Sequence, residues 1–319
     1  MNILSNDTTY PVNGFKTPVL FLTYCRPETT ILVFNVIRQI KPEKLYLAQN
    51  TPDRDDFENN KKWHVVRKLI ESVDWNCEVH RLYHNEHLDI KSSICSSITW
   101  FFENEEMGII LEDDCVPDIS FFQFCQELLE KYKDDDRIAM ISGNNFQFGR
   151  KVDNYSYYFS RYTHIWGWAS WRRAWKNYDP NMMLWPEIRS NHLLRYYLTK
   201  RSIYQYWKKI FDKCYKNDIL TWDYQWLFMS WIQNQLTILP CKNLVTNIGF
   251  GPEAVHTKGK SGLSNMKTEK MIFPLIHPEY IMPNMEADLY TEKKQFSGGN
   301  ILLKLLKKIK QLYFSLGNN

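Results

Sequence analysis

The chain has 319 residues, of which 44% are hydrophobic and 15% aromatic, so it can bury a large core and is not disordered. Its formal charge of +4 is small for this length, which argues against a nucleic-acid partner. Seven cysteines without a C-x-x-C pair predict free thiols in a reducing compartment. No apolar segment approaches the roughly 20 residues that span a bilayer, and "MNILSNDTTYPVNG" lacks the apolar core of a secretion signal. We therefore expect a cytoplasmic protein.

The first half of the chain alternates strand and helix patterns. "TPVLFLTYCRPE" predicts a strand that ends in a proline-containing turn, and "TTILVFNVIRQI" then has helical spacing. Further strands are predicted at 43–50, 77–85, 107–111 and 137–145, with helices at about 61–73 and 91–104 and a helix capped by Asp118. This alternation predicts an α/β fold in which a mostly parallel, Rossmann-like sheet is covered by helices on both faces.

The stretch "MGIILEDDCVPD" runs from a predicted buried strand into three consecutive carboxylates, Glu112, Asp113 and Asp114. In open parallel sheets, ligands bind outside the carboxyl ends of the strands. A divalent cation offsets the repulsion of such a cluster, and Mg²⁺ or Mn²⁺ held by one or two carboxylates plus phosphate oxygens is usual at nucleotide sites. The alternative is a solvated acidic turn that caps the next helix. The strand-end position favours the metal site.

Three other polar residues stand at the same predicted edge. Arg26 and Asn50 follow the first and second strands, and Lys91 lies at the start of a helix, where a basic residue can meet a phosphate. An ordinary exposed helix lysine is the alternative for Lys91.

The second half is rich in aromatic residues: nine of the 12 tryptophans fall between Trp166 and Trp231. Aromatic faces stack on sugars, so Trp168 and Trp222 are candidate ligand contacts, although most buried tryptophans are core residues. Gly167, between two tryptophans, predicts a tight turn or a close backbone approach.

Asp223 is the one acid in the helical-looking run "ILTWDYQWLFMSWI". A carboxylate in such surroundings is costly unless it is paired or functional, and partial burial tunes its pKa for general-base catalysis. The alternative is a helix cap. His256 lies in the glycine- and lysine-containing segment "GFGPEAVHTKGKSG", in which Lys258 and Lys260 are candidates for a lid over a leaving phosphate.

Four segments together resemble the GT-A glycosyltransferases: "PVLFLTYCRPETT", "GIILEDDCVPDISFFQFCQELL", "HIWGWASWRRAW" and "TWDYQW". The second is similar to the E-D-D metal motif of the animal N-acetylglucosaminyltransferase that starts complex N-glycan branches. The chain also resembles bacterial sugar transferases of surface-polysaccharide loci, some labelled hemolysin-like. The resemblance covers about residues 16–258, and the shared order of the segments makes it specific.

The resemblance implies a role for each strand-end residue. Asp114 would ligate the metal that bridges the donor diphosphate, Glu112 would contact the donor sugar, and Asp113 would face the ribose. Arg26 would face the diphosphate or the base. Asn50 stands where the family often has an aspartate that reads the base. This difference weakens the inference that the donor carries uridine, which is still the favoured base.

The resemblance also implies roles in the second half. Gly167 and Trp168 would adjoin the donor sugar, Trp222 would contact the acceptor, and Asp223 would deprotonate the acceptor hydroxyl. His256 would be a second metal ligand or close over the diphosphate.

After a polar break at 297–300, "ILLKLLKKIKQLYFSL" predicts a basic amphipathic helix at 301–316. Such a helix suits an anionic membrane surface, whereas the alternative is packing on the domain or on a second subunit. We expect a peripheral protein on the inner face of the cell membrane, where lipid-linked acceptors are found.

These features predict four parts: a nucleotide-sugar-binding half (16–145), an acceptor-binding and catalytic half (146–258), a lid loop and connecting tail (259–300), and the basic helix (301–316). The resemblance, together with Asp223 as a single general-base candidate, implies a metal-dependent, inverting transfer of a sugar from a nucleotide diphosphate sugar to a glycan or lipid-linked glycan in surface-polysaccharide synthesis. One alternative is a sugar-phosphate nucleotidyltransferase, although "TYCRPETT" lacks the usual glycine-rich loop. Another is a noncatalytic carbohydrate-binding protein of the same fold.

Overall fold

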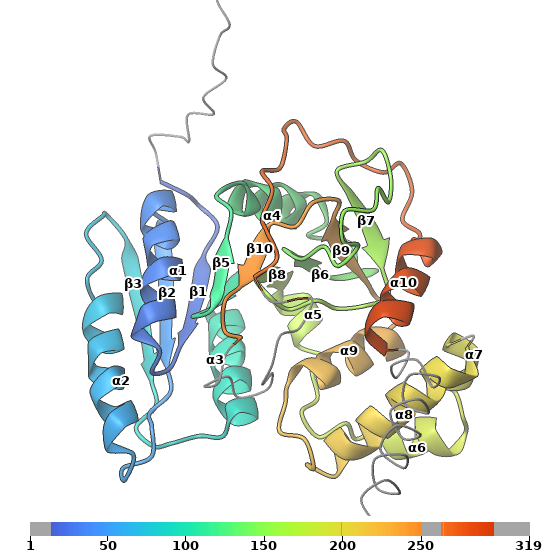
Figure 1. Ribbon diagram of the computed structural model, residues 1–319, viewed down its shortest axis with the longest axis horizontal. Helices are drawn as coiled ribbons and strands as arrows, with labels where there is room; N and C mark the ends of the chain where they lie inside the picture. Colours follow the sequence, from blue (N-terminus) through green and yellow to red (C-terminus); the bar gives the residue numbers. More distant parts are fainter. Residues whose placement is uncertain (1–13, 199, 251–262, 264, 297–319) are drawn as a thin grey trace, which may run out of the picture.

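The computed structural model describes residues 14–198, 200–250, 263 and 265–296 (Figure 1). The strands in this part of the chain are β1 (Val19–Thr23), β2 (Lys44–Gln49), β3 (Glu78–Tyr83), β4 (Met107–Glu112), β5 (Cys115–Pro117), β6 (Ile138–Ser142), β7 (Tyr157–Ser160), β8 (Trp168–Trp171), β9 (Leu236–Pro240) and β10 (Val245–Asn247). The helices are α1 (Pro27–Ile40), α2 (Phe57–Ile70), α3 (Ile90–Asn104), α4 (Ser120–Lys131), α5 (Arg172–Trp175), α6 (Trp185–Ser190), α7 (Leu194–Tyr197), α8 (Arg201–Tyr215), α9 (Asp223–Ile232), α10 (Met285–Thr291) and the π-helical turn η1 (Glu292–Phe296).

Eight strands form one sheet in the order β3-β2-β1-β4-β8-β6-β9-β7. Six of them run in one direction, whereas β8 is antiparallel to both β4 and β6, and β7 is antiparallel to β9 at the edge. The expected α/β fold with a mostly parallel sheet is therefore confirmed. Strand β6 comes from the predicted nucleotide-binding half but lies between β8 and β9, so the two predicted halves share one sheet.

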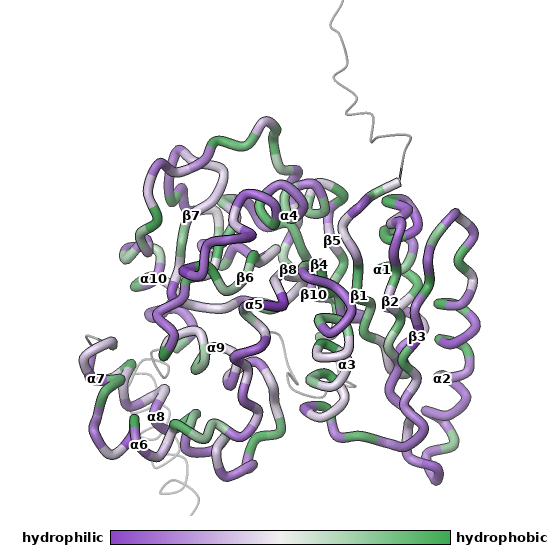
Figure 2. The backbone as a smooth tube through the Cα atoms, turned by 180° about the vertical axis from the view of Figure 1, so that it is seen from behind, coloured by the Kyte–Doolittle hydropathy of each residue, from purple (hydrophilic) through white to green (hydrophobic). Residues whose placement is uncertain are grey.

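The two faces of the sheet bury different helices because side chains alternate along each strand. Val19 and Phe21 of β1 belong to the core cluster that α1, α2 and α4 cover. Leu20 and Leu22 belong to the cluster on the other face, with α3, α5 and α9. In Figure 1, α1 and α2 lie in front of β1 to β3, and in Figure 2 α2 is coloured mostly hydrophilic, in keeping with its short buried side.

The predicted elements agree with the structure in type, with small shifts at their ends. Pro27 occupies the first turn of α1, where its missing N–H is tolerated. Asp118 precedes the cap position of α4, which is Ile119, although its Oδ1 still accepts a hydrogen bond from the Ser120 backbone N–H at 2.8 Å. The predicted strand at 137–145 is shorter, ending at Ser142.

Helices α6 to α9 form a helical lobe with its own aromatic core, which contains Trp185, Trp207, Phe211 and Trp231. Figure 1 shows this lobe below the β6–β9 part of the sheet, at the end from which α1 starts. Phe296 of η1 packs against this core, with its ring centroid 4.8 Å from that of Trp207.

The segment predicted as a lid loop and connecting tail (259–300) packs on the rest of the protein where the structure describes it. Met271 and Leu275 are buried in the core of the sheet, and α10 buries Asp288, which is 1% exposed. This part of the chain therefore packs on the folded body through some of its apolar and polar side chains.

The predicted basic helix at 301–316 and the residues His256, Lys258 and Lys260 lie outside the described residues. Within the described part of the chain, no helix is both long and apolar enough to cross a bilayer. All seven cysteines are described and are free thiols, as the sequence predicts.

Candidate active site

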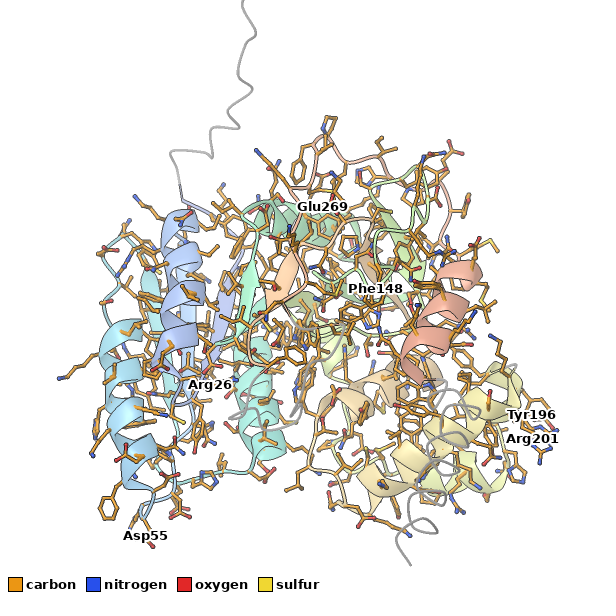
Figure 3. The ribbon with its side chains drawn as sticks, viewed as in Figure 1. Arg26, Asp55, Phe148, Tyr196, Arg201 and Glu269 are labelled. Carbon is orange, nitrogen blue, oxygen red and sulfur yellow. The ribbon has the colours of Figure 1, made fainter. Side chains whose placement is uncertain are left out.

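At the predicted edge of the sheet, Arg26 forms ion pairs with two of the three carboxylates, Asp113 and Asp114. Strands β1 and β4 are parallel neighbours, with Leu22 in register with Glu112, so the residues that follow both strands meet. Arg26 Nη1 donates to Asp114 Oδ2 at 2.7 Å, and Nη2 pairs with Asp113 Oδ1. Figure 3 shows Arg26 at the end of the sheet where α1 begins.

The two aspartates are buried, and each is held by several donors. Asp113 is 2% exposed, and its Oδ2 accepts a hydrogen bond from the Tyr24 backbone N–H at 3.2 Å. Burial raises the pKa of Asp113, while the Arg26 guanidinium acts in the opposite direction. Burial alone would lower the pKa of Arg26, but the Asp113 and Asp114 carboxylates outweigh it and raise that pKa. Arg26 is therefore a permanent cation at this edge.

Glu112 is the least satisfied member of the triplet. Its Oε1 is buried and has no hydrogen-bond partner among the described residues. Burial raises the pKa of Glu112 to about 8, and the carboxylates of Asp114, Asp113 and Asp223 add to this effect against the opposing charge of Arg26. The influence of Asp223 on Glu112 places the start of α9 within electrostatic reach of the end of β4.

Asp114 is enclosed by the last residue of β10 and by the residues that come after it. Asn247 is in antiparallel register with Cys115, and its Nδ2 donates to Asp114 Oδ1 at 3.3 Å. A Cβ added to Gly249 would lie 2.0 Å from Asp114 Oδ2, so only glycine fits beside this carboxylate. Asn247 and Gly249 are not among the site residues predicted from the sequence. The sequence feature that could have indicated them is the strand-like segment "NLVTNIG", at whose end they stand. The backbone of such a segment must pair with another strand.

The oxygen donors at this edge fit a hard divalent cation. The described residues hold no cluster of three or more His, Cys, Asp or Glu side chains arranged for a metal ion. A Mg²⁺-type ion in a nucleotide site, however, takes only one or two carboxylates from the protein and the rest of its ligands from phosphate and water. Asp114 suits that arrangement, and Oε1 of Glu112, which has no partner within the described residues, adds a buried acceptor next to it.

Asp223 is the first residue of α9, and it is partly exposed. The Thr221 hydroxyl donates to Asp223 Oδ1. The cap position belongs to Trp222, which makes no side-chain cap hydrogen bond, so the predicted capping role is not taken by Asp223. A carboxylate in the first turn still interacts favourably with the helix dipole.

Trp168 and Trp222 are core side chains in the structure. They are 0% and 3% exposed, and their rings stack with centroids 5.5 Å apart. Neither offers an open face for a sugar, so their predicted ligand contacts gain no support from the structure. Gly167 has φ of +63°, and a Cβ there would lie 2.8 Å from a methyl carbon of Val245, which matches the predicted tight turn.

Asn50 and Lys91 each form hydrogen bonds that connect separate loops. Asn50 Nδ2 donates to the Leu88 carbonyl at 2.8 Å, and its Oδ1 accepts from the Leu88 backbone N–H at 3.2 Å. Lys91 Nζ donates to Asn217 Oδ1 at 2.8 Å, which ties the start of α3 to the end of the α8 region. A cavity of about 400 Å³ opens beside Lys91, and Pro180 and Leu220 also line it. These contacts give both residues structural roles and leave their predicted donor contacts untested.

No protein-family model matches this sequence, and no curated relative matches it. The structure is similar to HddC from Yersinia pseudotuberculosis, at 10% identity and a TM-score of 0.30, with 49% of this chain and 77% of that chain covered. It is also similar to the mannosyltransferase PcManGT from Pyrobaculum calidifontis, solved with GDP-Man and Mn²⁺, at 11% identity and a TM-score of 0.35 over 52% of this chain and 49% of that one. A third likeness is to 4-diphosphocytidyl-2C-methyl-D-erythritol synthase from Anaerococcus prevotii, at 8% identity and a TM-score of 0.36 over 70% and 88% of the two chains. At such low scores and identities, these likenesses do not assign an activity to this chain.

Proposed function

We propose that this protein is a divalent-metal-dependent, inverting glycosyltransferase that uses a nucleotide diphosphate sugar as donor. The acceptor is a glycan or a lipid-linked glycan, and a uridine diphosphate sugar is the favoured donor. The observation that carries the proposal is the meeting of Arg26, Asp113 and Asp114 at the carboxyl end of β4, with Asp223 close enough to influence Glu112.

This arrangement separates two kinds of carboxylate. Asp113 and Asp114 are buried against the Arg26 guanidinium. The guanidinium suits binding of a charged diphosphate, and the carboxylates suit binding of its cation. Asp223 stands apart from that ion-paired group, on a different element, and is partly exposed at the start of α9. A single separate carboxylate suits a general base that deprotonates one acceptor hydroxyl for direct displacement, which inverts the anomeric carbon.

A bound Mg²⁺ or Mn²⁺ would neutralise charge that develops on the leaving diphosphate. Asp114 would hold it, with His256 as a second ligand proposed from the sequence. Arg26 would bind the diphosphate, and Glu112 would hydrogen-bond the donor sugar. Asp223 would accept the proton of the attacking hydroxyl.

The remaining parts of the proposal rest on the sequence. The basic helix at 301–316 would hold the protein on an anionic membrane surface, at the inner face of the cell membrane, near lipid-linked acceptors in surface-polysaccharide synthesis.

The test is hydrolysis of nucleotide sugars in the absence of acceptor. A glycosyltransferase with this site is expected to hydrolyse its donor slowly and only with Mn²⁺ or Mg²⁺, because water replaces the acceptor hydroxyl. Release of nucleoside diphosphate is measured for UDP- and GDP-sugars with the wild type and with Asp114→Asn. A protein that binds these donors without any metal-dependent release is a binding module, and the proposed activity is then wrong.

A further inference from the structure

Both carboxylate oxygens of Asp114 are occupied in the structure. Oδ2 accepts from Arg26 Nη1 at 2.7 Å, while Oδ1 accepts weaker contacts from Asn247 Nδ2 and Cys115 Sγ, each at 3.3 Å. A cation that binds Asp114 through Oδ2 must therefore displace the guanidinium first. The same guanidinium also holds Asp113, so its departure frees two carboxylates at once.

Arg26 is placed so that its side chain can leave while its backbone stays. Its carbonyl oxygen accepts the Thr30 backbone N–H at 3.0 Å, which fixes the start of α1. Its side chain is 36% exposed, whereas those of Asp113 and Asp114 are 3% and 10% exposed. The cation of this trio is thus partly exposed, whereas the two anions are buried.

A diphosphate offers the guanidinium an equivalent partner. The planar fork of an arginine matches carboxylate and phosphate oxygens alike, so moving from Asp113 and Asp114 to a phosphate conserves paired hydrogen bonds. The two aspartates then lose their counter-ion in a buried place, which favours the arrival of another cation.

We propose that Arg26 is an internal counter-ion that competes with the divalent cation for Asp114 and thereby couples metal binding to diphosphate binding. This inference rests on the proposed function, because it assumes that a divalent ion and a nucleoside diphosphate share this site. Without nucleotide, the ion pairs of Arg26 keep metal affinity low. With nucleotide, the guanidinium pairs with phosphate, and the freed carboxylates bind the ion more tightly. By linkage, the ion raises nucleotide affinity by the same factor.

The experiment measures Mn²⁺ binding to the whole chain from the electron paramagnetic resonance signal of free Mn²⁺, with and without UDP, and with GDP in parallel. Arg26→Met is expected to bind Mn²⁺ about tenfold or more tightly than the wild type when no nucleotide is present. UDP is expected to strengthen Mn²⁺ binding to the wild type by a similar factor and to have a smaller effect on Arg26→Met. The matched control is Arg137→Met, which removes an equal charge from an exposed pair with Asp135 and should leave Mn²⁺ affinity unchanged.

Arg26→Lys keeps the charge but cannot pair with both aspartates as a fork, so its Mn²⁺ affinity should lie between those of the wild type and Arg26→Met. If Arg26→Met does not fold, as judged by circular dichroism, Arg26→Lys carries the test. Equal Mn²⁺ affinities of the wild type and the folded Arg26 variants would overturn the competition, even if the wild type transfers sugar. Tighter Mn²⁺ binding by Arg26→Met, lost again in Arg26→Met/Asp114→Asn, would support it, even if no sugar transfer is found and the proposed function fails.

Discussion

Arg161 and Asp288 form an ion pair inside the protein: Arg161 Nε donates to Asp288 Oδ2 at 3.0 Å, and their side chains are 8% and 1% exposed. The Ser160 hydroxyl donates to Asp288 Oδ1 at 2.6 Å, and Arg161 also pairs with Glu292 at 3.3 Å. This network attaches α10 and η1 to the end of β7. It explains why a segment that looks like a tail in the sequence is part of the folded body.

Asp288→Asn should therefore destabilise the protein. It leaves the buried Arg161 guanidinium with less opposing charge, and breaking a buried pair by removing one partner costs about 3 to 5 kcal/mol. Urea denaturation followed by tryptophan fluorescence gives the free energy of unfolding. The matched control is Glu286→Gln, also on α10, because Glu286 pairs with Arg150 but its side chain is 82% exposed; about 0 to 1 kcal/mol is expected there. Equal effects of the two substitutions would contradict this account of the network.

Asp114→Asn should abolish the metal-dependent part of donor binding while the fold is kept. The substitution removes a ligand charge, and it also relieves repulsion within the triplet, so no large loss of stability is expected. Thermal-shift measurements with UDP-sugars, with and without Mn²⁺, detect any ligand that prefers the folded state. Asp118→Asn, in the turn before α4, is the control and should respond to Mn²⁺ as the wild type does. An unchanged Mn²⁺-dependent shift in Asp114→Asn would remove Asp114 from the metal site.

Asp223→Asn should keep donor binding and lose transfer. A positioned general base contributes about 100-fold or more, so the transfer rate should fall by at least that factor while the donor Kd stays near the wild-type value. Because Asn keeps the size of the side chain and α9 has no side-chain cap at this position, the fold should be unaffected. Transfer at a near-normal rate would leave Asp223 with only its interaction with the helix dipole.

His164 should make the protein less stable in mild acid. It is 6% exposed, its ring lies 4.4 Å from that of Phe146, and burial lowers its pKa from 6.5 to about 3. The unfolded chain therefore binds the proton more readily, so the stability from this group is complete above pH 6.5 and is lost as the pH falls toward 3.

The difference in unfolding free energy between about pH 7.5 and about pH 5 should be smaller by about 2 kcal/mol in His164→Asn than in the wild type. His64→Asn is the control for the loss of a histidine, because His64 is exposed. Parallel pH profiles for the wild type and His164→Asn would show that His164 is not buried in its neutral form.

The first four strands were predictable because helical patterns separate them, and because β1, β2 and β4 are short, mostly apolar runs. Strand β8 was not, because "WASW" lies in a run of aromatic residues with no strand boundary, and its place between β4 and β6 comes from long-range pairing. The same holds for β5 and β10, which are three residues each and pair with one another.

The same distinction between local sequence patterns and long-range pairing applies to the site residues. Arg26 and the carboxylate triplet were predictable together because they end neighbouring parallel strands. Asn247 and Gly249 were not, since an antiparallel pairing from much later in the chain brings them to Asp114. The role of Trp168 and Trp222 could not be decided from the sequence, because a stacked core and a sugar platform use the same aromatic faces.

Residues 301–319, which include the predicted basic helix, lie beyond the described part of the chain. The described fold ends with η1, whose Phe296 packs in the helical lobe, so a chain cut after residue 300 keeps this contact. The truncated protein should remain folded and bind donor as before, while its partition to anionic vesicles should fall sharply, because it lacks the basic amphipathic helix. Sedimentation with vesicles measures the partition, and circular dichroism reports the fold.

Replacement of the four lysines of this helix by glutamine separates charge from burial of the apolar face. Binding to anionic vesicles should weaken more than binding to neutral ones, since each lysine near a charged surface contributes about 1 kcal/mol. Added salt should have the same effect on the wild type, because it screens charges beyond about 8 to 10 Å. The substituted residues are Lys304, Lys307, Lys308 and Lys310. If truncation instead unfolds the protein or breaks a dimer while vesicle binding persists, the helix packs on protein and the proposed membrane location is wrong.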